Sequence, residues 1–326
     1  MLEIAGPLLD SLDRGRSVAV ATVVSIEGSA PRGLGASMAW DGSVAIGSVA
    51  GGCVEGAVLD VLEQVLADGR VREIEFGIPE SGSDAERALA VGLSCGGRLR
   101  FHLAVLHPDH RARDALRRAR AGLPARVALT STGVEPGECP GAFVDEAVPP
   151  TRLLITGAMA FSAALSAAAQ TLGWRVTVID PRSTFLTSER FPGAEIVVEW
   201  PPEYLARTAA LLGPRDVVCL LSHDDRYDAE ALHLALDSDA GYVGAMGSRL
   251  TDERRRKALR ALGIAEERLA RLHSPIGLDL GAITPEETAI SILAEVIRER
   301  EGGSGVSLTG THGSIHRTQE VAHEAG

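Results

Sequence analysis

The chain of 326 residues has only four cysteines, and no two of them are closely spaced. Such sparse thiols argue against a disulfide framework and fit reduced cysteines in a cytoplasmic protein. The chain also lacks an excess of positive charge, because its formal net charge is −12. We therefore expect no general binding to nucleic acid. Two arginine-rich stretches, residues 111–120 and 254–260, have helical spacing and predict solvated helix faces or partner surfaces.

Export and membrane signals are lacking as well. Residues 1–13 include acidic side chains and no basic n-region, and the most apolar later stretch, residues 153–169, is interrupted by a glycine and by hydroxyl side chains. The sequence therefore predicts neither a secretory signal nor a membrane-spanning helix. Metal-ligand spacings such as His-Glu-x-x-His are also missing, so no zinc site is predicted.

What is present fits a two-domain α/β protein, since 45% of the residues are apolar and the chain is long enough for two cores. Residues 1–106 predict a small mixed α/β domain with one helix over residues 54–68 and a hairpin turn at Asp41-Gly42. Its predicted strands cover residues 17–26, 36–40, 43–49, 71–76 and 98–106.

Two glycine–cysteine clusters, Gly51-Gly52-Cys53 and Cys95-Gly96-Gly97, are the most distinctive feature of this domain. Cys53 lies between a predicted strand and a predicted helix, where free N–H groups and the helix dipole favour anions and lower a thiol pKa. Arg32 and Arg98 lie near the clusters in sequence. The pattern predicts a reactive cysteine beside an anion site; the alternative is two small buried residues in ordinary turns.

Residues 107–150 have a looser pattern, which predicts a linker region. It contains one basic helix, a short strand at residues 125–130 and a proline- and glycine-rich run that ends at Pro149-Pro150. We place the domain boundary there, and we expect Cys139 to have no function. The length of this linker motivates the hypothesis of a homodimer in which the domains of different subunits complete one site.

Residues 151–300 predict a Rossmann-like, doubly wound parallel sheet. A strand at residues 152–156 leads through Gly157 into a helix, and the next strand ends at Asp180, 23 positions after the glycine. In dinucleotide-binding folds such a glycine turn holds a pyrophosphate and the acidic residue holds a ribose. Here Met159 and Ser162 occupy the second and third glycine positions, and a methionine would obstruct the phosphates. The fold is therefore expected, whereas a bound NAD(P) is the weaker hypothesis.

Three polar loops follow the later strands of this half. One contains His223 and Asp224, one runs from Gly244 to Arg249, and one covers residues 273–279. The last precedes a helix that begins at Thr284-Pro285-Glu286-Glu287, a capping-box pattern. Because open α/β sheets bind ligands at the carboxyl ends of their strands, the three loops together predict a pocket.

The motifs together resemble the xanthine dehydrogenase accessory protein family of the XdhC/CoxI type. The resemblance rests on Glu27-Gly-Ser-Ala-Pro-Arg32, Gly47-Ser-Val-Ala-Gly-Gly-Cys-Val-Glu-Gly56, Gly92-Leu-Ser-Cys-Gly-Gly97, Val178-Ile-Asp-Pro-Arg182, Tyr242-Val-Gly-Ala-Met-Gly-Ser-Arg249 and Pro275-Ile-Gly-Leu-Asp-Leu-Gly281. It covers most of residues 14–300. It implies an accessory protein that binds the molybdenum cofactor as cargo, supports its sulfuration with a cysteine desulfurase, and delivers it to an apo molybdenum hydroxylase of the xanthine dehydrogenase or CO dehydrogenase type.

The resemblance also suggests roles for the residues singled out above. Cys53 and Cys95 would contact the molybdenum or relay sulfur, and Arg32 would pair with anionic groups of the cofactor. The turns and loops would hold the remainder of the cofactor, through Gly51, Gly52, Gly96, Gly97, Gly157, Asp180, His223 and Arg249.

Other functions remain open at this point. One is an NAD(P)-dependent oxidoreductase that uses the Rossmann-like domain and the paired cysteines, and another is a scaffold whose glycine turns are only structural. Residues 301–326 lack apolar periodicity and predict a flexible tail. The sequence does not decide whether the protein is an enzyme, although a non-catalytic accessory role fits the motifs better.

Overall fold

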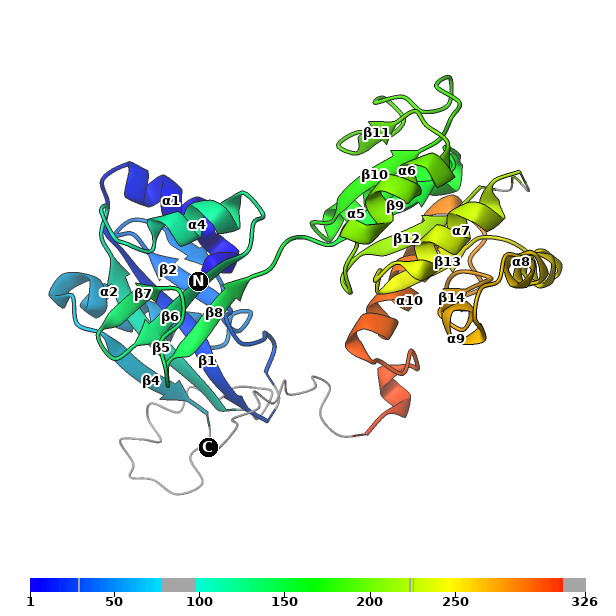
Figure 1. Cartoon of the computed structure of the whole chain (residues 1–326). Helices are drawn as coiled ribbons and strands as arrows, with labels where there is room; N and C mark the ends of the chain where they lie inside the picture. The colour runs from blue at the N-terminus through cyan, green and yellow to red at the C-terminus, as the bar shows by residue number, and fades with distance from the viewer. Residues whose placement is uncertain (29, 78–97, 223, 225, 313–326) are drawn as a thin grey trace. The chain divides into compact units, whose positions relative to one another are not determined.

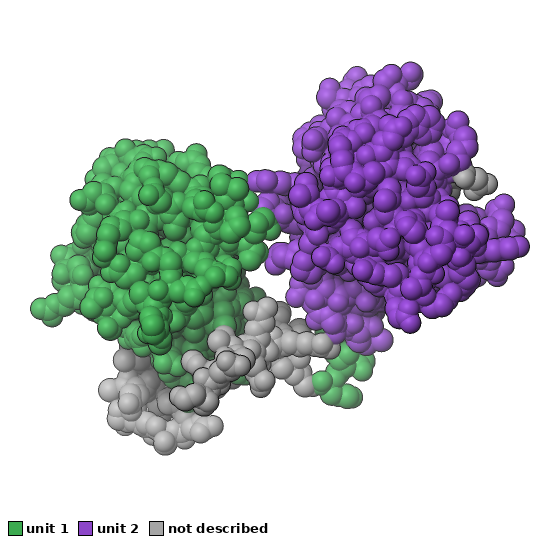
Figure 2. All heavy atoms as spheres, in the orientation of Figure 1, with its two compact units in different colours: residues 1–149, 308–326 green, residues 150–307 purple. Residues whose placement is uncertain are grey.

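The computed structural model describes residues 1–28, 30–77, 98–222, 224 and 226–312 (Figure 1). The chain forms two compact units, one made by residues 1–149 with residues 308–326 and the other by residues 150–307 (Figure 2). Both are of the α/β class, and the predicted fold class is confirmed, with antiparallel sheets in the first unit and one parallel sheet in the second.

The first unit is built on a five-stranded antiparallel sheet of order β3-β2-β1-β5-β4. Its strands are β1 (Val18–Glu27), β2 (Ser37–Trp40), β3 (Ala45–Gly47), β4 (Arg72–Phe76) and β5 (Arg98–Leu106), and its helices are η1 (Leu2–Ile4), α1 (Ala5–Asp13), α2 (Glu55–Asp68) and α4 (Arg113–Arg120).

Both faces of this sheet are buried, and the central strand β1 shows how. Val18 and Val20 point into one core, which also contains residues of α1 and α4, whereas Ala19, Ala21 and Val23 point into the core beneath α2. Successive side chains of a strand alternate between faces, so a continuous apolar strand lies in the middle of a sheet that is covered on both sides. The fully buried β1 therefore anchors the elements that carry the glycine–cysteine turn.

Residues 107–150, predicted as a linker, instead belong to the first unit. They form α4 and an antiparallel sheet of order β7-β6-β8, made by β6 (Ala125–Thr130), β7 (Gly133–Pro136) and β8 (Phe143–Ala147). Val127, Leu129 and Val134 are buried in the same core as α1. The prolines and glycines that suggested a linker lie in the turns between these short strands. The dimer hypothesis, which was based on a long linker, loses that argument.

The second unit has the doubly wound fold. Six parallel strands run in the order β11-β10-β9-β12-β13-β14, which is the 3-2-1-4-5-6 order of dinucleotide-binding folds. The strands are β9 (Arg152–Thr156), β10 (Arg175–Ile179), β11 (Glu195–Val197), β12 (Val217–Leu220), β13 (Tyr242–Ala245) and β14 (Leu272–His273).

Helices cover both faces of this sheet (Figure 1). Leu153 and Ile155 of β9 point toward a core shared with α5 (Ala160–Thr171) and α10 (Pro285–Glu301), while Leu154 points to the other core. That second core is covered by α6 (Pro201–Thr208), η2 (Ala209–Leu211), α7 (Asp228–Asp237), α8 (Arg249–Ala261) and α9 (Glu266–Leu269). The strand order changes direction between β9 and β12, so the loops after these two strands flank the topological switch point.

The start of α10 confirms the sequence pattern that predicted it. The Thr284 side chain accepts the N–H of Glu287, and the Glu287 carboxylate accepts the N–H of Thr284, which together make a capping box. At the other end of the chain, residues 302–312 are exposed and include the short η3 (Leu308–Gly310), and the rest of the predicted tail lies outside the described residues. Over the described part of the chain, no helix has both the length and the apolar character that crossing a membrane requires.

Candidate cofactor site

The turn that carries Cys53 connects β3 to α2, as the sequence predicted. Gly51 and Gly52 have φ angles of 76° and 119°, which favour glycine. Both are exposed, and a Cβ atom added to either would meet no other atom within 4 Å. The glycines are therefore required by the backbone conformation rather than by packing, and the surface above the turn is open.

Glu55, the first residue of α2, fills the inside of this turn with its carboxylate. One carboxylate oxygen accepts the Ser48 hydroxyl at 2.7 Å and the Ala50 N–H at 2.9 Å, and the other accepts the Gly52 N–H at 2.8 Å. The N–H groups of Val49 and Val54 lie at 3.3 and 3.2 Å. The N–H groups that the sequence assigned to an anionic ligand thus already hold an anion of the chain itself.

The charge of Glu55 is stabilised by these contacts. Burial by itself would raise its pKa, but the hydrogen bonds from Ser48, Ala50 and Gly52 outweigh burial and lower the pKa to about 2. The carboxylate is therefore ionised at neutral pH, and it neutralises the positive end of α2.

Cys53 is half-buried beside this carboxylate-filled turn. Its thiol donates to the Ala50 carbonyl over a distance of 3.6 Å, and its side chain packs against the core beneath α2. Cys53, Cys139 and Cys219 are free thiols. Cys219 is fully buried in β12, and its burial raises its pKa. Of these three thiols, only Cys53 lies next to exposed glycines at a strand-to-helix turn.

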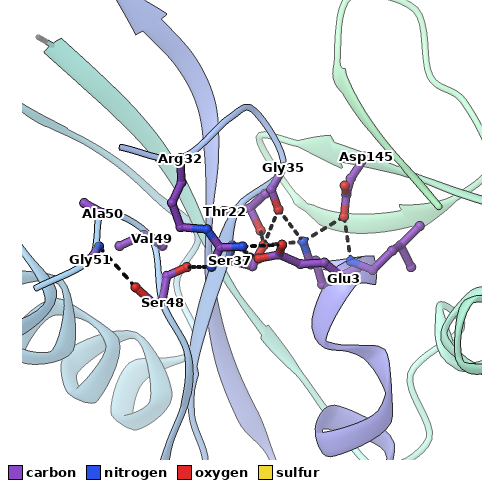
Figure 3. Close-up of polar contacts among 12 residues, drawn as sticks. Glu3, Thr22, Arg32, Gly35, Ser37, Ser48, Val49, Ala50, Gly51 and Asp145 are labelled. Atoms are coloured by element: carbon purple, nitrogen blue, oxygen red, sulfur yellow. Dashed lines mark hydrogen bonds and ion pairs between the residues drawn. The ribbon is translucent and has the colours of Figure 1, made fainter. Parts of the chain in front are cut away.

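Arg32 secures the turn from the outside (Figure 3). One nitrogen of its guanidinium donates to the Ser48 carbonyl at 2.6 Å, and another donates to the Glu3 carboxylate at 2.7 Å. The same Glu3 carboxylate accepts the Ser37 N–H at 2.7 Å. Arg32 was predicted to bind the cofactor, but these contacts use it to fix the turn to β2 and to the N-terminal segment.

The second glycine–cysteine cluster, Cys95-Gly96-Gly97, lies outside the described residues, and so does His223. Whether Cys95 lies near Cys53 remains a prediction. Among the residues that the structure does describe, no group of three or more His, Cys, Asp or Glu side chains is arranged to hold a metal ion. A cargo metal bound by single thiols would not require such a group.

In the second unit, the two parts of the predicted nucleotide fingerprint bind each other. The Asp180 carboxylate is fully buried and accepts the N–H of Ala158, directly after Gly157, at 2.7 Å. It also accepts the Arg182 guanidinium at 2.9 and 2.7 Å. Burial would raise the pKa of Asp180, but the hydrogen bonds from Arg182 and Ala158 lower it. Asp180 thus holds the glycine turn instead of presenting a free carboxylate to a ribose.

Gly157 is held by packing as well as by conformation. Its φ is 93°, and an added Cβ would lie 2.9 Å from the amide nitrogen of Ser222. The loops after β9 and β12, which flank the switch point, are therefore in direct contact. Ser162 is buried at the third glycine position and donates to the Gly157 carbonyl, whereas Met159 is half-buried at the N-cap of α5. Gly157 is a structural glycine in this arrangement.

The remaining edge residues are more exposed. Arg249 is the first residue of α8 and is exposed, and Asp224 forms an ion pair with Arg226 over 2.5 Å. The hydrogen bond from Arg226 lowers the pKa of Asp224 to about 2. The Arg226 guanidinium lies over the ring of Trp200, 5.3 Å from its centroid. The loops after β12 and β13 therefore carry charged groups, as predicted.

Sequence reasoning missed three residues that organise these sites, namely Glu55, Asp228 and Arg255. Glu55 appears in the quoted motif, and its place directly after a glycine turn was a usable signal for a carboxylate that folds back onto N–H groups. Arg255 was assigned to a solvated helix face, but its side chain is 5% exposed and pairs with Asp228. Helical spacing of arginines alone does not reveal which of them points inward.

Comparison with known proteins agrees with this architecture in both units. Residues 11–77 match the model of the XdhC and CoxI family, and residues 153–296 match that of the XdhC Rossmann domain. The chain is 27% identical to a protein named molybdenum cofactor insertion chaperone PaoD of Escherichia coli strain K12, over 90% of this chain and 86% of that protein. It is also 27% identical to a protein of Bacillus subtilis strain 168 that is named as a probable subunit of xanthine dehydrogenase, over 90% and 97%.

Two further similarities extend over almost the whole chain. An uncharacterized protein, YqeB of Escherichia coli strain K12, is 27% identical over 92% of this chain, which spans only 47% of that longer relative. A crystal structure described as a xanthine dehydrogenase from Bacillus halodurans superimposes with a TM-score of 0.74 at 25% identity, covering 94% of this chain and 98% of that one. With a family match in each unit and similar relatives along nearly its full length, the chain belongs to the XdhC and CoxI family.

Proposed function

We propose that this chain binds the molybdenum cofactor as cargo and inserts it into a molybdenum hydroxylase of the xanthine dehydrogenase type, with no turnover of its own. The observation that carries the proposal is the similarity, over 90% of this chain, to a relative named as a molybdenum cofactor insertion chaperone. Family matches in both units support a role that needs the whole chain.

The geometry around Cys53 suits a soft metal. A half-buried thiol lies beside two exposed glycines, so a bulky ligand can approach the sulfur without displacing side chains. Molybdenum in a sulfur-rich cofactor favours thiolate ligands. In the resting turn the thiol donates its proton to the Ala50 carbonyl, so coordination would release that proton to solvent.

We further propose that the protein protects the cofactor while a cysteine desulfurase supplies its terminal sulfur, with Cys53 and Cys95 as the thiols that contact the metal. The charged loops of the second unit, including Arg249, would hold the anionic part of the cofactor.

No observation in the second unit favours an NAD(P)-dependent oxidoreductase. The Ala158 N–H and the Asp180 carboxylate, which a dinucleotide would use, are bonded to each other. A nucleotide would have to break this contact and the ion pair between Asp180 and Arg182 before it could bind.

Cofactor delivery tests the proposal. A limiting amount of molybdenum cofactor is mixed with an apo molybdenum hydroxylase, with and without the purified protein, and recovered hydroxylase activity is measured. We expect a higher yield with the protein present, and a further gain when cysteine desulfurase and cysteine are supplied. An unchanged yield at every protein concentration, together with tight binding of NAD, would reject the proposal.

A further inference from the structure

Arg255 is a buried cation in the middle of an arginine-rich helix. It lies on α8, between the exposed Arg254 and the half-buried Arg256, and its side chain is only 5% exposed. Burial of a guanidinium costs free energy unless its N–H groups find partners. The identity of those partners therefore indicates what the residue does.

The partners of Arg255 come from three different segments at the carboxyl edge of the parallel sheet. Its guanidinium donates to the Met246 carbonyl after β13 at 3.2 Å and to the Ser274 hydroxyl after β14 at 3.5 Å. It also lies 3.5 Å from the Asp228 carboxylate at the start of α7. One planar side chain thus spans loops that are far apart in sequence.

Asp228 extends this connection to the switch point. One of its oxygens accepts the Ser222 hydroxyl at 2.7 Å, and the other accepts the Asp224 N–H at 3.2 Å. Ser222 lies against Gly157 and within 3.4 Å of the Thr156 hydroxyl. The loops after β9, β12, β13 and β14 are therefore joined through one buried ion pair.

The lengths of these contacts argue against a role in stability alone. Arg255 has three long contacts, and replacing a buried ion pair by well-packed apolar residues is often neutral or stabilising. Burial also raises the pKa of Asp228, which its hydrogen bond from Ser222 and its pairing with Arg255 only partly offset. Such pairs contribute to a single arrangement of the surrounding structure rather than to free energy.

We propose that Arg255 and Asp228 are positioning residues, which hold the loops after β9, β12, β13 and β14 in one arrangement for ligand binding at the carboxyl edge of the sheet. The assignment of that ligand as the molybdenum cofactor rests on the proposed function. Neither residue needs to touch the ligand. An arginine suits this role because its planar fork reaches several acceptors at once, which a lysine ammonium does not.

Amide hydrogen exchange of Arg255→Lys tests the positioning role without any ligand. The substitution keeps the charge, and Arg254→Lys, one residue away at an exposed position, is the matched control. We expect exchange of the Asp224 and Met246 amides to accelerate by about tenfold or more in Arg255→Lys and to stay at the parent rate in Arg254→Lys. Parent-like exchange of these loops in a folded Arg255→Lys would overturn the proposal.

A second variant covers the case in which Arg255→Lys does not fold. Arg255→Met combined with Asp228→Leu removes both buried charges and leaves no unpaired partner. We expect this double variant to fold with a melting temperature near that of the parent while the same loop amides exchange faster. A double variant with parent-like loop exchange would show that the pair is dispensable for loop order and would reject the proposal.

Cofactor binding then separates this inference from the proposed function. If the parent retains molybdenum cofactor, we expect the dissociation constant of Arg255→Lys to rise about tenfold, as is typical for residues that orient binding groups. Unchanged affinity would overturn the positioning role. If the parent binds no cofactor, the proposed function fails, and the exchange measurements still decide whether Arg255 and Asp228 position the loops.

Discussion

The two units each have a glycine turn that leads from a strand into a helix, and in each a carboxylate accepts N–H groups of the turn. In the first unit the carboxylate is Glu55, which belongs to the helix that follows the turn. In the second unit it is Asp180, which comes from the next strand. The glycines differ in their surroundings, since Gly51 and Gly52 are open to solvent whereas Gly157 packs against Ser222.

This difference shows that a glycine turn beside an acidic residue does not by itself mark a nucleotide site. Around Gly157, the close approach of the backbone is used for packing between two loops of the sheet. Around Gly51 and Gly52, the glycines leave an open surface next to a thiol. The first unit therefore offers the better candidate for direct contact with a ligand, and the second offers a braced sheet edge.

The largest effect is expected from Gly157→Ala. The new methyl group would lie 2.9 Å from the Ser222 nitrogen at a φ of 93°, so both a clash and backbone strain oppose it. We expect a loss of about 3 kcal/mol in the free energy of unfolding, measured by urea denaturation. Gly173→Ala is the control, because Gly173 has a φ of 72° and open surroundings. Equal losses in the two variants would show that contact with Ser222 does not matter.

Glu55→Gln should have the next largest effect. The amide nitrogen of glutamine cannot accept the turn N–H groups, so we expect a loss of about 2 kcal/mol at pH 7. The native pKa of about 2 lies below the ordinary value of 4.5. The stabilisation from the charge is therefore complete above about pH 4.5 and is lost as the pH falls toward 2.

Acid denaturation checks the sign of this effect. The difference in unfolding free energy between the parent and Glu55→Gln should shrink as the pH decreases from 5 to 2. A difference that stays constant with pH would mean that the carboxylate charge does not stabilise the turn.

Gly51→Ala should have a smaller effect on stability. The methyl group would enter open space, and only the φ of 76° opposes it, so we expect a loss of about 1 kcal/mol. Urea denaturation of Gly51→Ala and Gly157→Ala under the same conditions therefore separates conformational strain from packing. A loss for Gly51→Ala as large as that for Gly157→Ala would contradict the open turn.

Much of this fold could be predicted from local patterns. The apolar alternation of β1, the β-α-β unit around Gly157 and the capping box at Thr284 depend on neighbouring residues, and the structure confirms them. The short strands β6, β7 and β8 were mostly missed, because their few apolar residues become a pattern only when they pack against α1 and α4.

The site was harder to predict than the fold. Cys53 was placed correctly at a strand-to-helix turn, but the occupation of that turn by Glu55 depends on how one side chain folds back. The engagement of Asp180 by Ala158 and the burial of Arg255 depend on contacts between segments distant in sequence. A sequence pattern shows which groups can bind a ligand, whereas the structure shows which of them the chain itself already uses.

The most direct test is retention of molybdenum cofactor by the parent protein, Cys53→Ala and Cys139→Ala, measured by ultrafiltration and molybdenum analysis. Cys139 is the matched control, because it is also a free, half-buried thiol of the first unit. The account predicts stoichiometric retention by the parent and by Cys139→Ala, and a clear loss in a folded Cys53→Ala. Equal retention by all three would contradict a metal contact at Cys53, and no retention by the parent would contradict cofactor binding itself.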